Sequence, residues 1–380
     1  MNVVAVAHHL LPEIRFGEGA LYACLLIVAF LVGSRAYGGV RHFRGIGERL
    51  LIVGTSPLTR RVVEELARHP RRYKLVGMVE DGIDLERVIA ARRPDRIIVG
   101  FTDRRGRVPL ARLIESRARG IQIEDVVETY ERLTGKLALE LMAPSRLIFS
   151  PEFATARVQP VFERALSLLV AVAGLIVLAP VMLVVALAIK LDSRGPVFFV
   201  QQRAGLYRMP FDLIKFRTMH PVEGRHSEWE RDNSSRITRC GYWLRRFRLD
   251  ELPQLLNMLR GDMNLVGPRP HPMTNVELLV LTARNLSEVS GDAIPYYSLR
   301  CSVRPGITGW AQVRYCYANS LEQEVEKIRY DFYYLKHLSV WLDVRILFET
   351  VRIIVSGHRS VPDEIEKASA EAVEAHRESA

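Results

Sequence analysis

Cysteine is scarce in this chain, and its few cysteines lie far apart. Cys24, Cys240, Cys301 and Cys316 are the only four in 380 residues. They form no close pair and no cluster with the spacing of a metal site. The pattern argues against a disulfide framework or a zinc-binding fold, and we expect buried or unreactive thiols in a reducing compartment.

Signals for nucleic-acid binding are also missing, although the chain is basic. Its formal net charge is +10, from 53 lysines and arginines against 43 acids. A basic repeat, a zinc-finger spacing and an aromatic RNA-binding motif are all absent from the sequence. We therefore expect no nucleic-acid partner, and an anionic membrane surface or a phosphorylated substrate accounts better for the charge.

The first of two long apolar runs spans about residues 20–33, within a predicted N-terminal membrane segment at 1–44. The run is short for a full membrane span. No A-x-A cleavage site follows it, which argues against a secretory signal peptide. Basic residues then accumulate at Arg35, Arg41 and Arg44. The positive-inside rule places the chain after this run in the cytoplasm.

The second apolar run, Ala165 to Ile189, contains 25 residues without a charge. Its length alone predicts a transmembrane helix. Both flanks are basic, however, and a crossing helix would carry everything after it to the opposite side of the membrane. Pro180 removes a backbone hydrogen bond in the middle of the run. We therefore expect a re-entrant helix over about 162–190, broken at Pro180, and a kinked spanning helix is the alternative.

Residues 45–150 alternate between strand-like and helical patterns. This order predicts an α/β domain with a Rossmann-like parallel sheet. The first turn reads VGTSPLTRR, and Ser56 and Thr59 stand where a dinucleotide fingerprint would need glycines. A structural or regulatory domain is therefore favoured over an NAD-linked nucleotide-sugar modifying enzyme.

The most informative segment is 248–270, RLDELPQLLNMLRGDMNLVGPRP. Pro253 suits the first turn of a helix, so we expect a helix to begin near Asp250. Asp250 and Glu251 would then lie at its positive end, which also attracts phosphate. In isolation, such an acid pair is usually a helix cap. In an arginine-rich setting, an ionised carboxylate is a candidate nucleophile toward phosphorus.

Basic residues concentrate in short blocks around these acids. An arginine held between prolines has a restricted direction of approach, which helps to orient its guanidinium against a phosphate oxygen. A single block would be read as a solvated surface charge. Six occur within about 120 residues: KLDSRGPVFFVQQR (190–203), DLIKFRTM (212–219), RITR (236–239), LRRFR (244–248), VGPRP (266–270) and VRPGITGWAQV (303–313).

The segment after residue 320 has helical periodicity and is rich in aromatic and basic residues. Two interpretations fit it equally. Its helices lie on the bilayer surface, or they pack an aromatic stripe into the core. Residues 361–380 are rich in Ala and Glu, and we expect a flexible tail there.

Together with YDFYYLKH (330–337), these blocks and the acid segment closely resemble the bacterial sugar transferase family, monotopic polyprenyl-phosphate sugar-1-phosphate transferases. The resemblance covers residues 157–360, and residues 45–150 resemble the accessory domain of longer members associated with exopolysaccharide synthesis and exosortase systems. It implies a mostly helical, membrane-associated catalytic domain with a re-entrant helix. It also implies a place on the cytoplasmic face of the bacterial inner membrane and a homodimer.

The resemblance further implies a reaction and a set of site residues. A sugar 1-phosphate would pass from a UDP-sugar to polyprenyl phosphate, with release of UMP. Asp250 matches the nucleophile and Glu251 its partner acid, and Mg²⁺ would be held by both. Lys215, Arg217, Arg269 and Arg304 match phosphate contacts. A non-catalytic membrane scaffold is the remaining alternative, which the presence of both acids and all the basic blocks disfavours.

Overall fold

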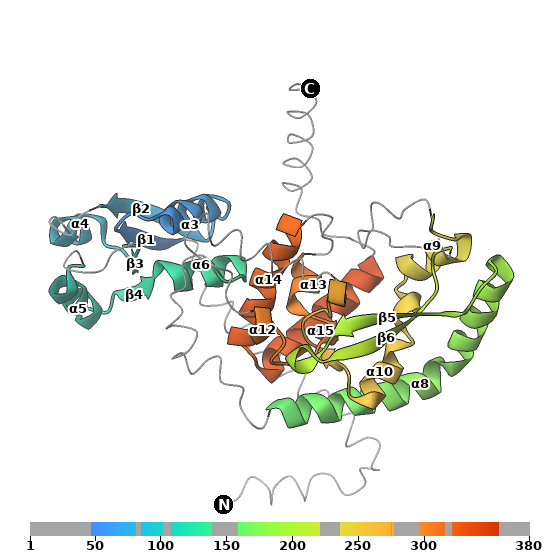
Figure 1. Ribbon diagram of the computed structural model, residues 1–380. Helices are drawn as coiled ribbons and strands as arrows, with labels where there is room; N and C mark the ends of the chain where they lie inside the picture. Colours follow the sequence, from blue (N-terminus) through green and yellow to red (C-terminus); the bar gives the residue numbers. More distant parts are fainter. Residues whose placement is uncertain are drawn as a thin grey trace, which may run out of the picture. The chain divides into compact units, whose positions relative to one another are not determined.

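The computed structural model of the chain describes residues 47–80, 85–101, 108–138, 159–220, 236–274, 276, 297–315 and 321–356. The chain divides into two compact units between Val126 and Val127 (Figure 1). The predicted apolar run at 20–33 and the predicted tail at 361–380 lie outside the described residues.

The first unit is built on a parallel sheet, which confirms the α/β prediction. Its four strands pair in the order β2-β1-β3-β4. Residues Leu50 to Val53 of the central strand β1 are fully buried, as expected for a parallel strand covered on both faces. The strands are β1 (Glu48–Val53), β2 (Tyr73–Val79), β3 (Arg96–Val99) and β4 (Gln122–Asp125), and the helices between them are α3 (Pro57–Ala67), α4 (Leu85–Arg92) and α5 (Leu110–Ala118).

The turn after β1 is closed by side chains where a dinucleotide-binding turn has glycines. The Ser56 hydroxyl accepts a hydrogen bond from the backbone N–H of Thr59 at 3.1 Å, which caps α3. Thr59 is fully buried, and its hydroxyl donates to the carbonyl of Gly100 at 3.3 Å. The Thr59 side chain thus joins α3 to the residue that follows β3.

Helix α6 (Val126–Thr134) and the residues up to Ala138 pack within the second unit. Leu137 is fully buried against Ile328 and Phe332, and its N–H donates to the Arg329 carbonyl at 3.1 Å. The Trp310 indole donates to the Gly135 carbonyl at 2.7 Å. Residues 127–138 therefore pack with the second unit, because this segment buries its apolar side chains there.

The longest helix of the second unit, α8, runs from Gln159 to Asp192 and contains Pro180. Among the described residues, it is the one helix long and apolar enough to cross a membrane. Large apolar side chains point outward along it, and Ile176 and Leu183 are 72% and 73% exposed. The helix continues across Pro180 instead of breaking into two, and Figure 1 shows it bent. A bend is what a missing backbone hydrogen bond inside a helix produces.

One side of α8 packs on α10, which carries the predicted active-site segment. Ala171 of α8 lies in a buried cluster with Leu255 and Met258 of α10. The Arg164 guanidinium donates to the carbonyls of Met258 and Leu259 at 2.6 and 3.2 Å, which satisfies the last turn of α10. The membrane-type helix and the acid segment thus form one packed unit.

The rest of the second unit consists of short helices around two small sheets. The antiparallel hairpin is β5 (Phe198–Ala204) and β6 (Pro210–Phe216), and the parallel pair is β7 (Asn264–Val266) and β8 (Gly306–Thr308). The helices are the 3₁₀ turn η4 (Leu206–Arg208), α9 (Arg239–Arg246), the 3₁₀ turn η6 (Leu249–Glu251), α10 (Gln254–Arg260), α12 (Tyr297–Arg300), α13 (Trp310–Arg314), α14 (Leu321–Lys336) and α15 (Val340–Ser356).

Glycine is required where β7 and β8 meet. A Cβ atom on Gly306 would lie 2.1 Å from the backbone N of Gly267, so the two chains approach too closely for any side chain. This contact explains the glycines of the VGPRP and RPGITG motifs and brings the two motifs side by side.

The core-packing interpretation of the C-terminal segment is confirmed for one of its two helices, α14. Helix α14 packs into the core, with Phe332 and Tyr334 buried. Helix α15 exposes a row of apolar side chains that includes Trp341, Phe348 and Val355.

Candidate functional site

The acid pair lies in the turn between α9 and α10. Arg248 adopts the left-handed conformation with φ of 57°, which ends α9 and redirects the chain. Leu249 to Glu251 then form η6, and α10 begins at Gln254. The expected helical start near Asp250 is confirmed, with the difference that the acids occupy a separate 3₁₀ turn. The left-handed conformation of Arg248 carries a small backbone strain, and it sets the direction of the chain that bears both carboxylates.

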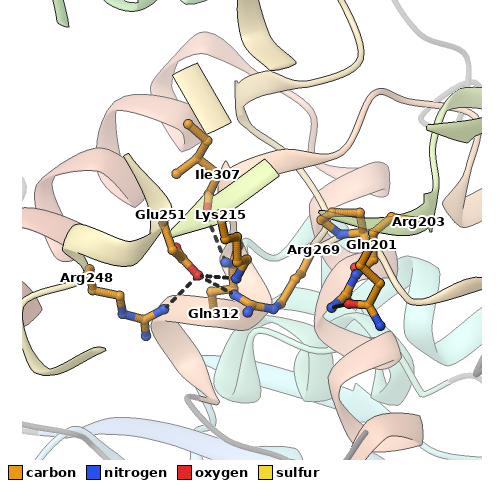
Figure 2. A network of polar contacts seen from close by, with 9 residues as sticks. Gln201, Arg203, Lys215, Arg248, Glu251, Arg269, Ile307 and Gln312 are labelled. Atoms are coloured by element: carbon orange, nitrogen blue, oxygen red, sulfur yellow. Dashed lines mark hydrogen bonds and ion pairs between the residues drawn. The ribbon is translucent and has the colours of Figure 1, made fainter. Parts of the chain in front are cut away.

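Glu251 is the centre of a cluster of cations (Figure 2). Its Oε1 lies 3.0 Å from Lys215 Nζ, 3.4 Å from Arg269 Nη1 and 3.8 Å from Arg248 Nη1. Figure 2 shows Arg248 approaching from one side and Lys215 and Arg269 from the other. The Glu251 side chain is only 10% exposed. One buried carboxylate oxygen therefore gathers three positive charges from β6, the α9–α10 turn and the VGPRP segment.

The two adjacent acids differ in their affinity for protons. Burial raises the pKa of Glu251, but the charges of Lys215, Arg269 and Arg248 lower it more strongly, so the net pKa lies well below its ordinary value. The pKa of Asp250 is raised, by burial first and then by the neighbouring negative charge of Glu251. Glu251 is therefore a permanent anion, whereas Asp250 is a poorly solvated and more basic carboxylate.

Asp250 is the less engaged of the two carboxylates. Lys215, Arg245 and Arg248 lie close enough to the Asp250 carboxylate to lower its pKa electrostatically. An attacking carboxylate needs free oxygens within reach of cations that bind the phosphate. Asp250 lies near such cations, whereas Glu251 Oε1 is shared among three of them.

Lys215 and Arg269 are the two predicted phosphate-contacting residues that the fold brings to the acid pair. Burial lowers the pKa of Lys215, and Glu251 opposes this effect. The Arg269 side chain is 38% exposed and so retains access to a ligand. Arg203 extends the same basic surface, since its charge acts on Lys215 and its Nη1 donates to the Pro270 carbonyl at 3.1 Å.

Arg217 and Arg304, also predicted to contact phosphate, donate hydrogen bonds to backbone carbonyls. Arg217 is buried, and its Nη2 and Nη1 donate to the carbonyls of Ser193 and Arg194 at 2.8 and 3.1 Å. It therefore holds the chain just after α8. Arg304 Nε donates to the Gly261 carbonyl at 3.0 Å, just after α10. The sequence could not separate these roles, because each arginine lies in a motif as basic as those of Lys215 and Arg269.

A buried ion pair supports Arg269 from behind. Arg300 Nε lies 2.7 Å from Asp331 Oδ2, and both side chains are 3% exposed. Burial alone would lower the pKa of Arg300, but Asp331 raises it above its ordinary value, so the guanidinium stays charged. Arg300 Nη2 donates to the Arg269 carbonyl at 2.5 Å. A continuous chain of contacts thus runs from α14 through Arg300 and Arg269 to Glu251.

Sequence reasoning named neither Arg300 nor Arg248 as a site residue. The position of Arg248 directly before the acids, within LRRFR, is a signal that could have identified it. Arg300 had no such signal. It has no flanking proline, and it reaches the site only because α12 and α14 pack together.

The fit of Mg²⁺ depends on the two acids. In the described parts of the chain, no three His, Cys, Asp or Glu side chains cluster as a metal site. The Asp250 carboxylate and Glu251 Oε2 are the oxygens beside the cations that the observed ion pairs leave available. Mg²⁺ is commonly held by one or two carboxylates together with substrate phosphates, so this donor set fits it when a diphosphate is bound.

Comparisons with known proteins agree on one family. The model of the bacterial sugar transferase family matches residues 158–357. The undecaprenyl-phosphate glucose phosphotransferase of Komagataeibacter xylinus is 31% identical over 386 residues, which cover 90% of this chain and 70% of that protein. The UDP-glucose:undecaprenyl-phosphate glucose-1-phosphate transferase of Caulobacter vibrioides is 42% identical over 192 residues, which cover 50% of this chain and 68% of that protein.

A third relative is named for a different sugar. The UDP-N-acetylgalactosamine-undecaprenyl-phosphate N-acetylgalactosaminephosphotransferase of Aeromonas hydrophila is 38% identical over 241 residues, which cover 62% of this chain. This chain spans about half, 53%, of that relative's length. The relatives therefore agree on the acceptor in their names and differ in the sugar.

Proposed function

Because the chain belongs to the bacterial sugar transferase family, we propose that it transfers a sugar 1-phosphate from a UDP-sugar to polyprenyl phosphate, with undecaprenyl phosphate as the acceptor. This reaction would begin the synthesis of an exopolysaccharide or another surface glycan. The observation that carries the proposal is the contrast between the two acids, a fixed anion that gathers cations and a more basic carboxylate beside it.

The first step is attack by an Asp250 oxygen on the β-phosphorus of the UDP-sugar. A bond forms between Asp250 and phosphorus, the bond from that phosphorus to the bridging oxygen breaks, and UMP leaves with this oxygen. Lys215, Arg248 and Arg269 neutralise charge on the phosphate oxygens. Glu251 keeps these three cations in place through its low pKa and does not itself attack.

The second step restores the carboxylate. An oxygen of polyprenyl phosphate attacks the same phosphorus, the bond to Asp250 breaks, and the product is a polyprenyl diphosphate sugar. Mg²⁺, held by Asp250 and Glu251 together with the phosphates, would offset the negative charge of the diphosphate.

The proposed placement in the membrane rests on α8. Its outward apolar side chains are stabilised when lipid surrounds them. Basic residues flank both ends, with Arg164 before and Lys190 and Arg194 after, and they favour the cytoplasmic side for both ends. We therefore propose a re-entrant helix bent at Pro180, which keeps Asp250 on the side where nucleotide-sugars occur. Single cysteines at Gln159 and Gly195 test this in oriented vesicles. An impermeant thiol reagent on the cytoplasmic side should label both positions, and protection of one of them would indicate a spanning helix.

The reaction is tested by incubating purified full-length protein with Mg²⁺, undecaprenyl phosphate and a panel of UDP-sugars. We expect UMP release with at least one sugar, and a covalent phosphosugar adduct when the acceptor is omitted. Asp250→Asn should abolish both. Asp212→Asn removes an exposed acid from β6 and serves as the control, with near-normal rates expected. Full turnover by Asp250→Asn would refute the covalent mechanism.

A further inference from the structure

Helix α14 carries three charged side chains on one face. Glu324, Lys327 and Asp331 follow the spacing i, i+3 and i+7, which places them on the same side of a helix. Their side chains are largely buried, at 16%, 14% and 3% exposed, respectively. Lysines and acids are seldom buried to this extent without partners, so this face indicates a polar site inside the second unit.

Both acids of this face are joined to the segment that carries Arg269. Glu324 Oε2 lies 3.3 Å from Nε2 of His271, two residues after Arg269. Asp331 reaches the Arg269 carbonyl through the buried arginine ion pair described above. Because Lys327 lies between these two acids on the helix, its side chain is directed at the same segment.

The Glu324–Lys327 pair repeats the arrangement of Glu251 and Lys215. The two Nζ–Oε1 distances are 3.5 and 3.0 Å, and the lysine side chains are 14% and 15% exposed. Burial lowers the pKa of both lysines, the paired glutamate opposes this effect, and the charge of Arg269 lowers each pKa further. Arg269 therefore lies within electrostatic reach of both lysines, and its own side chain is 38% exposed.

Glu324 is a fixed anion, as Glu251 is. Burial alone would raise the pKa of Glu324, but His271 and Lys327 lower it to about 2. The carboxylate faces His271 with Oε2 and Lys327 with Oε1. The contact to Lys327, at 3.5 Å, is longer than a tight charge-assisted hydrogen bond, and an ammonium has three donors. Lys327 is therefore held in place by Glu324 and keeps donors for an anionic ligand.

The proposed reaction brings two phosphates into the site in each step. In the first step, Asp250 attacks the β-phosphate while the α-phosphate leaves within UMP. An in-line displacement places the leaving oxygen opposite the attacking one. In the second step the acceptor displaces Asp250, so its oxygen approaches from the position that UMP vacated. One phosphate-binding position opposite Asp250 therefore serves UMP and the acceptor in turn.

We infer that Lys327 binds the phosphate that is not attacked, first the α-phosphate of the UDP-sugar and then the phosphate of polyprenyl phosphate. Lys215 and Arg248 stay with the β-phosphate, and Arg269, within reach of both lysines, bridges the two phosphates. Lys327 supplies charge and hydrogen bonds, and it forms no bond to phosphorus. The inference rests on the proposed function and assigns its second phosphate position.

The binding test uses purified full-length protein in detergent, with equilibrium dialysis against radiolabelled UMP or uridine. UMP carries the phosphate in question, and uridine lacks it. Lys327→Met should raise the dissociation constant of UMP by about 10- to 100-fold, the range for hydrogen bonds to a charged group, and leave that of uridine unchanged. Lys327→Arg retains the charge and should recover part of the UMP affinity.

The acceptor test applies the same variants to the UMP-release assay. Because UMP and the acceptor phosphate share one position, Lys327→Met should also raise the KM for undecaprenyl phosphate by about 10-fold or more. An unchanged KM would contradict the shared position.

Lys336→Met serves as the control for both tests. Lys336 lies on the same helix, its side chain is 12% exposed, and it pairs with the buried Glu131 at 2.7 Å. This variant should lose a comparable amount of stability in thermal unfolding and retain the UMP affinity and the acceptor KM of wild type.

Two kinds of result would overturn the inference. Unchanged UMP binding by a folded Lys327→Met variant would show that Lys327 does not contact the phosphate. An equal loss of UMP and uridine binding, or an equal loss in Lys336→Met, would show that the substitutions act through the fold of α14. The proposed function fails separately: it is refuted if wild type releases UMP from no UDP-sugar, whereas the inference fails with wild-type turnover intact.

Discussion

The Asp331→Asn substitution should lower the stability of the fold and also remove the support that holds Arg269 in position. Asp331 is buried to 3% exposure and pairs with Arg300, which in turn donates to the Arg269 carbonyl. Removing one partner of a buried ion pair leaves the other charge uncompensated, at a cost of about 3–5 kcal/mol. The variant should therefore unfold at a lower temperature, and Arg269 should lose its fixed position relative to Glu251.

The effect on catalysis follows from positioning. A displacement on the order of 1 Å in a group that binds the reacting phosphate can lower the rate about 100-fold. We expect kcat for UMP release to fall by about 10- to 100-fold, at a temperature where both variant and wild type are folded. Because Asp331 is a positioning residue that does not contact the substrate, the loss should appear mainly in kcat and less in KM.

Glu131→Gln is the matched control. Glu131 of α6 is also 3% exposed, and it lies 2.7 Å from Lys336, which belongs to α14 as Asp331 does. It should lose a comparable amount of stability and keep its turnover when folded. Equal losses of turnover in the two variants would refute the argument, since the effect would then come from a weakened α14 and not from Arg269.

Three further predictions follow from the contacts around the site. Glu251→Gln leaves the buried Lys215 without its carboxylate partner. The free energy of unfolding measured in urea should therefore fall by about 3 kcal/mol. An unchanged value would contradict the role of Glu251 as the centre of the cation cluster. Burial, followed by the charge of Glu163, raises the pKa of Asp343 to about 7, whereas the unfolded chain ionises near its ordinary value. The folded state therefore binds the extra proton below pH 7, and wild type should lose about 1 kcal/mol of stability between pH 6 and pH 8.5, a loss that Asp343→Asn should not show in thermal unfolding. Gly306→Ala places a Cβ 2.1 Å from the Gly267 backbone, so β7 and β8 should separate and UMP release should be lost. Gly47→Ala in the first unit is the control. Its nearest contact is 3.2 Å, and UMP release should be retained.

Much of the architecture could be predicted from patterns that local physics enforces. Alternating strand and helix patterns predicted the parallel sheet, because buried parallel strands need continuous apolar runs. The apolar run predicted a long apolar helix, but the expected break at Pro180 is a bend in one continuous helix. Pro253 and the acids before it predicted the helical start, because a helix accepts proline most readily in its first turn. The family resemblance likewise rested on linear motifs and is confirmed.

Which acceptor each arginine binds could not be predicted in this way. Arg217, Arg269 and Arg304 all lie in basic motifs, yet Arg217 and Arg304 donate to backbone carbonyls, and only Arg269 reaches Glu251. Which acceptor a guanidinium meets depends on elements far apart in sequence. The packing of residues 127–138 within the second unit depends on such contacts too, since Leu137 finds its partners in α14.

The sequence by itself determined the element types, the family and the candidate acids, because helix starts, apolar runs and motifs are properties of neighbouring residues. Only the tertiary structure decided how Asp250 and Glu251 differ. Their side chains are chemically similar and adjacent, but β6 and the VGPRP segment bring Lys215 and Arg269 into ion pairs with Glu251. Charge interactions strengthen as water is excluded, so this packing makes one acid a fixed anion and leaves the other as the more basic carboxylate.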